Sequence, residues 1–99
     1  MDRLHVIARL KAHEVELREM GLMSLSMFGS TARGDQHADS DVDLAATFDH
    51  GKKVAGFFRF VAIQDRLREV LGVSVDLVGE PARKDRVQAQ IDRDRIRVF

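Results

Sequence analysis

The sequence predicts a single small domain, residues 1–99, of mixed α/β class, in which a small mixed β-sheet is backed by helices on one face. Three observations support this. The 99 residues suffice for one domain and are too few for two. Segments whose apolar residues follow helical spacing alternate with segments in which apolar and polar residues alternate. The second and third predicted strands are joined through a long helix, which favours a crossover connection.

The N-terminal third predicts a helix, a strand and a turn. Apolar side chains at helical spacing predict a helix over residues 2–20, and Gly21 follows where a helix end favours a left-handed residue. Over residues 22–28, apolar residues alternate with serines, which indicates a strand. The Gly-containing segment 29–35 that follows predicts a turn with a single helical turn.

The rest of the chain continues the alternation of helices and strands. Residues 41–48 predict a second strand, residues 53–71 a long helix, and residues 73–78 a third strand. A short helix is expected near residues 83–91. Residues 95–99 alternate in polarity and fit either a short edge strand or a frayed helix.

Composition excludes several classes of function. Sixteen basic and sixteen acidic residues give zero net charge, which argues against bulk nucleic-acid binding, and we expect no nucleic acid as direct substrate. The absence of cysteine excludes disulfides, thiolate zinc sites and cysteine nucleophiles. No apolar run approaches the roughly 20 residues that span a bilayer, and the N-terminus lacks the apolar stretch of a signal peptide. We therefore expect a cytoplasmic protein without a membrane partner.

Three acidic residues lie where chemistry is expected. Asp41 and Asp43 are two residues apart on a predicted strand and so share one face, and Asp76 lies on the polar face of a later strand. If these strands are neighbours, three carboxylates converge, and their mutual repulsion favours a bound Mg²⁺ or Mn²⁺. Two alternatives remain: the first pair forms a solvated face of an edge strand, or Asp76 caps a helix or pairs with an arginine.

A second group of residues suits phosphate binding. Gly29 permits close backbone approach, the N–H groups that follow it form an anion site, and Ser30 adds a hydroxyl donor. Arg33, one helical turn later, is positioned to form a charge-assisted bond to a phosphate oxygen. The alternatives are a tight turn in which Ser30 caps a helix, and a surface role for Arg33, which is one of twelve arginines.

The joint pattern resembles the DNA polymerase beta-like nucleotidyltransferase superfamily, and within it the minimal nucleotidyltransferases of bacteria and archaea. The matching segments are residues 28–35, FGSTARGD, and residues 40–44, SDVDL, followed by Asp76 in a later strand. The resemblance implies the polymerase-beta-like fold, with a mixed sheet backed by helices.

The resemblance also implies roles for individual residues. Gly29 and Ser30 would hold the nucleotide phosphates. Asp41 and Asp43 would ligate Mg²⁺. Asp76 would complete the triad and serve as the base for the attacking hydroxyl.

The same resemblance implies a partner and a reaction. Minimal members are often encoded beside a HEPN-domain protein and act as its antitoxin, and they can transfer AMP from ATP to it. The alternatives are an antitoxin that neutralises a HEPN ribonuclease by complex formation alone, and a nucleotide-sensing regulatory subunit. Larger relatives carry a further domain that holds the base and the acceptor. We therefore expect a partner, or a second copy of this chain, to complete the site.

Overall fold

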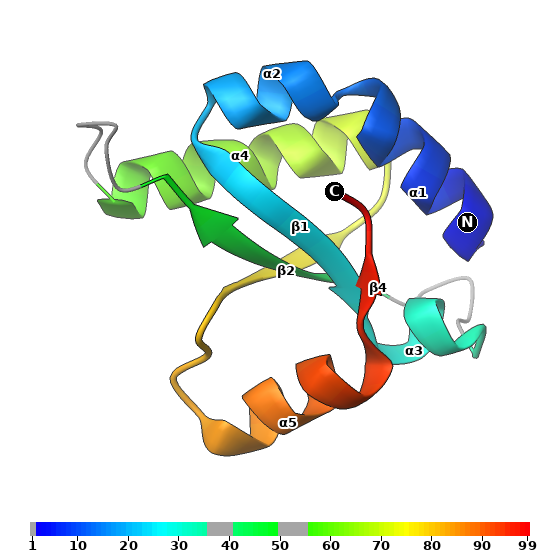
Figure 1. Cartoon of the computed structure of the whole chain (residues 1–99). Helices are drawn as coiled ribbons and strands as arrows, with labels where there is room; N and C mark the ends of the chain where they lie inside the picture. The colour runs from blue at the N-terminus through cyan, green and yellow to red at the C-terminus, as the bar shows by residue number, and fades with distance from the viewer. Residues whose placement is uncertain (1, 36–40, 50–55) are drawn as a thin grey trace.

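The fold is built on a four-stranded sheet with the strand order β3-β2-β1-β4 (Figure 1). The computed structural model describes residues 2–35, 41–49 and 56–99. The strands β1 (Leu22–Phe28) and β2 (Val42–Phe48) are antiparallel, and β3 (Val75–Gly79) runs parallel to β2. The short β4 (Ile96–Arg97) pairs antiparallel with β1, so the C-terminal residues form an edge strand and not a frayed helix. The predicted mixed sheet is confirmed.

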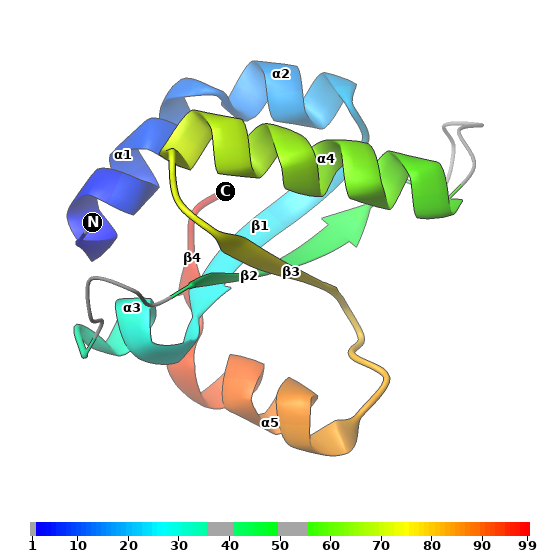
Figure 2. The same ribbon diagram turned by 180° about the vertical axis from the view of Figure 1, so that it is seen from behind.

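Three helices back one face of the sheet, as the sequence predicts: α1 (Arg3–Ala12), α2 (Glu14–Glu19) and α4 (Gly56–Leu71) (Figure 2). The predicted N-terminal helix is divided at His13, whose backbone (φ −107°, ψ 14°) leaves the helical region. No helix of the described ranges is long and apolar enough to cross a membrane. The helices and the strands enclose one core, made largely of Val6, Leu10, Leu17, Leu25, Met27, Leu44, Ala46, Ile63, Leu67 and Leu77.

The helix α4 connects β2 to its parallel neighbour β3. Its buried Ile63, Leu67 and Val70 recur at helical spacing and pack on the apolar side of the strands. The predicted helix start, at residues 53–55, lies outside the described residues. This crossover makes β2 an inner strand, paired with β1 on one side and with β3 on the other.

The opposite face of the sheet is partly covered by α5 (Asp85–Asp94), the short helix predicted near residues 83–91, which lies across the sheet from the other predicted helices (Figure 1). Phe28, Ala45 and Ile91 form a second small core there, with Val78 and Val87 packed against it. The short helix α3 (Gly29–Arg33) continues directly from β1 and also contacts α5. The polar face of β2 and β3 is therefore left open between α3 and α5.

Candidate active site

Asp43 and Asp76 are direct partners in the register of the parallel strands β2 and β3. Asp43 is partly buried and Asp76 is exposed. Within the described residues, neither side chain forms a hydrogen bond or an ion pair. The alternative of a solvated edge strand does not hold for Asp43, because β2 lies between β1 and β3. Among the residues that the structure describes, Asp76 neither caps a helix nor pairs with an arginine.

The electrostatics of this pair favour a cation. The pKa of Asp43 is raised to about 6, first by burial and then by the negative charges of Asp76 and Asp41, while Arg33 opposes the shift. Uncompensated carboxylate oxygens of this kind are the donors that Mg²⁺ and Mn²⁺ prefer, so the residues present fit such an ion. These two carboxylates are the first candidates for its ligands.

Asp41 lies immediately before β2, exposed to solvent, and acts on Asp43 through its charge. In the described ranges, no three His, Cys, Asp or Glu side chains are arranged to hold a metal ion. The structure thus brings Asp43 and Asp76 together, whereas a ligand role for Asp41 remains a prediction.

Gly29 lies against the Asp43 side chain where β1 passes into α3. Its φ of +73° lies in the left-handed region. A Cβ built there would overlap Asp43 Oδ2 and lie 3.1 Å from Asp43 Cγ. A side chain at this position would occupy the space beside the carboxylate, so glycine is required for the close approach.

Ser30 is partly buried and lines the same site. The cap residue of α3 is Phe28, and no side chain forms a capping hydrogen bond there, so the alternative of Ser30 as a helix cap is wrong. Among the described residues its hydroxyl has no hydrogen-bond partner. The Ser30 hydroxyl is therefore available to a ligand in the site.

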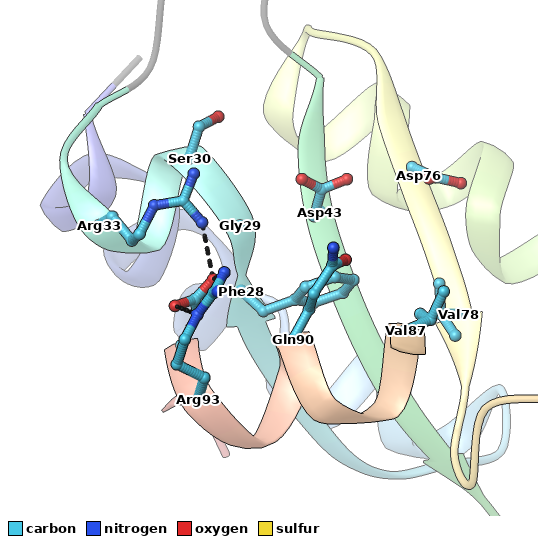
Figure 3. A pocket seen from close by; sticks show the side chains of 11 residues that line it. Phe28, Gly29, Ser30, Arg33, Asp43, Asp76, Val78, Val87, Gln90 and Arg93 are labelled. Carbon is cyan, nitrogen blue, oxygen red and sulfur yellow. Dashed lines mark hydrogen bonds and ion pairs between the residues drawn. The ribbon is translucent and has the colours of Figure 1, made fainter. Parts of the chain in front are cut away.

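These residues surround a cavity of about 430 Å³ on the open face of the sheet (Figure 3). Its floor comes from β2 and β3, and its walls come from α3 and α5. In Figure 3, Ser30 and Arg33 lie on one side of Asp43, and Asp76 lies on the other. The lining residues are Phe28, Gly29, Ser30, Arg33, Asp43, Asp76, Val78, Val87, Gln90, Arg93 and Asp94.

Two arginines of the cavity wall share one carboxylate. Arg33 Nη1 donates to Asp94 Oδ2 at 2.7 Å, and its Nε donates to Asp35 Oδ2 at 3.2 Å. Arg93 donates from Nε to Asp94 Oδ1 at 2.9 Å and from Nη2 to Oδ2 at 3.0 Å. Only 4% of the Asp94 side chain is exposed, and its arginine partners, Arg93 first, lower its pKa to about 2. This cluster holds two guanidinium groups at the cavity.

Sequence reasoning identified Arg33 but missed Arg93 and Asp94. The two partners of the Arg33–Asp94 ion pair are 61 positions apart, so no local spacing indicates it. The only signal was the run of basic residues near the C-terminus, which by itself is typical of a solvated helix.

Comparison with known proteins settles the family. The family model described as a nucleotidyltransferase domain matches residues 10–98. The chain belongs to this nucleotidyltransferase family. One relative, the protein adenylyltransferase MntA of Thermococcus cleftensis, is 34% identical over 86 residues, which cover 86% of this chain and 84% of the relative.

Solved structures of nucleotidyltransferases share the fold. A structure assigned as a minimal nucleotidyltransferase superposes with a TM-score of 0.78 at 32% identity, covering 97% of this chain and 95% of that one. A complex of a tri-AMPylated HEPN toxin with its MNT antitoxin, from Shewanella oneidensis, contains a chain with a TM-score of 0.62 at 17% identity. That match covers 90% of this chain and 68% of the other. At such low identity the second match speaks for the fold alone.

Proposed function

We propose that this nucleotidyltransferase transfers AMP from ATP to a hydroxyl group of a HEPN-type toxin and acts as the antitoxin of the pair. The observation that carries the proposal is the Asp43–Asp76 pair, which has no hydrogen-bond or ion-pair partner among the described residues and faces a cavity beside Gly29 and Ser30. A protein as acceptor is supported by the similar protein adenylyltransferase MntA. The HEPN toxin is proposed by analogy with the more distant complex of the same fold, which holds an AMPylated HEPN toxin. As part of this proposal, we expect the reaction to take place in the cytoplasm.

In this proposal Asp43 and Asp76, together with Asp41, hold Mg²⁺ or Mn²⁺. Their oxygens are hard ligands, and the raised pKa of Asp43 reflects its burial and the nearby negative charges of Asp76 and Asp41. When bound, the ion would offset the phosphate charge and polarise the α-phosphate.

The protein's own groups then orient the nucleotide and move one proton. The backbone beside Gly29, the Ser30 hydroxyl and the guanidinium groups of Arg33 and Arg93 bind the β- and γ-phosphates. The acceptor hydroxyl passes its proton to Asp76 as its oxygen bonds to the α-phosphorus. The bond from that phosphorus to the bridging oxygen breaks, and pyrophosphate leaves toward the arginines.

A label-transfer experiment tests this function. The protein is incubated with α-labelled ATP, Mg²⁺ and its HEPN-domain partner protein. We expect label on the partner, and its loss in Asp43→Asn and Asp76→Asn. The matched control is Asp65→Asn, since Asp65 is an exposed carboxylate on α4 outside the cavity lining. Absence of transfer by the wild type, or equal transfer by the Asp43 variant, overturns the proposal.

The same variants separate catalysis from simple binding. If Asp43→Asn still neutralises the toxin fully, complex formation is sufficient and the antitoxin acts as a binding module. If neutralisation is lost while the complex still forms, AMP transfer is the operative step.

A further inference from the structure

A second cavity of about 430 Å³ lies beside the first, at the outer edge of the sheet. Its walls come from α4, β3 and the segment that leads into α5. Two of its lining residues, Val78 and Val87, also line the first cavity, so the two cavities adjoin. In Figure 3 this valine pair lies on the Asp76 side of the site, away from Ser30 and Arg33. The lining residues are Phe60, Leu77, Val78, Gly79, Ala82, Arg83, Lys84 and Val87.

The second cavity includes an open strand edge. In the described part of the chain, β3 has a neighbouring strand on one side only. Its even-numbered residues bond to β2, since Val42 N donates to Ser74 O and Glu80 N donates to Ala46 O. The main-chain groups of the odd-numbered residues therefore face outward. Two of these outward groups are already bonded to side chains of α4, because Val75 O accepts from Arg68 Nη2 at 3.2 Å and Leu77 N donates to Gln64 Oε1 at 3.3 Å. The part of the edge that these side chains leave open lies at Gly79, whose backbone is in the cavity lining.

The wall that faces this edge is held in place by side-chain bonds. Ala82 N donates to Gln88 Oε1 at 2.8 Å, and Gln88 Nε2 donates to Glu80 Oε2 at 2.9 Å. Arg95 Nη1 in turn donates to Glu80 Oε1 at 2.9 Å. The cavity is thus a preformed feature of the segment between β3 and α5.

The geometry of the transfer decides which substrate comes near this cavity. The attacking and leaving oxygens of a phosphoryl displacement lie roughly in line across the phosphorus. In the proposed function, pyrophosphate leaves on the side of Ser30 and Arg33. The attacking hydroxyl must then come from the opposite side, where Asp76 lies and where the second cavity opens.

From this geometry we infer that the second cavity binds the protein acceptor, as an extended segment that pairs with the edge of β3 at Gly79. An apolar side chain of that segment, close to the acceptor hydroxyl, fills the space between Phe60 and Ala82. Arg83 and Lys84 are exposed at the rim and form no ion pair with other described residues, so the segment is expected to carry acidic residues. This inference rests on the proposed function and names the part of the acceptor that the site recognises.

Two variants of the cavity test the inference. Ala82→Trp fills the apolar space, and Lys84→Glu reverses a rim charge at an exposed position where folding is not at risk. Ala89→Trp is the matched control, because Ala89 is exposed on α5 and lies outside both linings. Label transfer to the HEPN-domain protein is measured over a range of acceptor and ATP concentrations.

For both cavity variants we expect the KM for the acceptor to rise about tenfold, while the KM for ATP changes by less than about twofold. An unchanged acceptor KM in both variants overturns the inference. So does an equal rise in the KM for ATP, which would show that the cavity holds part of the nucleotide.

Direct binding keeps the inference separate from the proposed function. The affinity of immobilised HEPN-domain protein for each variant is measured without nucleotide, and a loss of about tenfold in Ala82→Trp but not in Ala89→Trp supports the acceptor cavity. If the wild type transfers no label, the proposed function fails, and this affinity alone then decides the inference. Equal affinity of wild type, Ala82→Trp and Lys84→Glu overturns it.

Discussion

The backbone of Gly29 lies directly against the carboxylate of Asp43, where β1 passes into α3 beside β2. A Cβ atom at position 29 would overlap Oδ2 of Asp43. This contact places the residues predicted to bind phosphate, Gly29 and Ser30, directly beside the carboxylate pair Asp43–Asp76. Because the backbone approaches the carboxylate without an intervening side chain, phosphate oxygens and a cation bound by Asp43 can share the same space.

Gly29→Ala is expected to damage both stability and transfer. Gly34 provides the control, since its φ of +80° is also left-handed but no atom lies within 4 Å of a Cβ there. Gly34→Ala should cost only the backbone strain, roughly 1–2 kcal/mol. Gly29→Ala should cost more and should lower the rate of transfer on the order of 100-fold, because the carboxylate is displaced. Urea denaturation and label transfer measure the two effects, and equal behaviour of the two variants would refute the contact argument.

Asp94→Asn is expected to weaken ATP binding. The carboxylate holds Arg33 and Arg93 together at the cavity wall, and without it their positive charges repel each other. We expect the KM for ATP to rise about tenfold with little change in the KM for the acceptor. Asp92→Asn is the control for ATP binding, since the Asp92 side chain is 63% exposed and lies outside the lining of the first cavity. Asp92 contacts Arg95 at 3.5 Å and accepts a hydrogen bond from Gln88 Nε2 at 3.0 Å. A lower KM for ATP in Asp94→Asn would instead show that Asp94 competes with phosphate for the arginines.

The same carboxylate predicts a dependence of stability on pH. Hydrogen bonds from Arg93 and Arg33 lower the pKa of Asp94 from 3.8 to about 2 in the folded protein. Its contribution to stability is therefore complete above the unfolded-state pKa and is lost as the pH falls from about 4 toward about 2. The Tm difference between wild type and Asp94→Asn, measured from neutral to acidic pH, should stay constant and then shrink in that window. If the Tm difference between wild type and Asp94→Asn is still unchanged near pH 2, the lowered pKa of Asp94 does not contribute to stability in this way.

Mg²⁺ is expected to stabilise the protein through Asp43 and Asp76. An ion that binds only the folded state raises Tm by mass action, at about 4–8 °C per kcal/mol for a domain of this size. Thermal unfolding with Mg²⁺, against NaCl of equal ionic strength, should show this rise in wild type and in Asp65→Asn. Asp43→Asn and Asp76→Asn should lose it. If both site variants keep the full Mg²⁺-dependent rise in Tm, the ion does not bind at Asp43 and Asp76.

Local patterns were sufficient for much of the fold. The alternation of apolar and polar residues predicted the strands to within two or three residues and placed Asp43 and Asp76 on polar faces, which the strand register confirms. The break at His13 was not predicted, because Leu4, Ile7 and Val15 continue the helical spacing across it. The structure shows that Leu4 and Val15 are in fact exposed, so part of that spacing did not report burial.

The sequence by itself determined the order of the elements, the glycine at the start of α3 and the faces of the acidic residues, since each depends on backbone preference or on a period of two. Only the tertiary structure decided that β3 lies beside β2, that α5 covers the second face, and that Asp94 meets Arg33. Strand order and helix docking depend on burial summed over the whole core, between residues far apart in the chain, and no local spacing records that sum. For the same reason the open edge of β3, and the cavity beside it, became visible only in the folded chain.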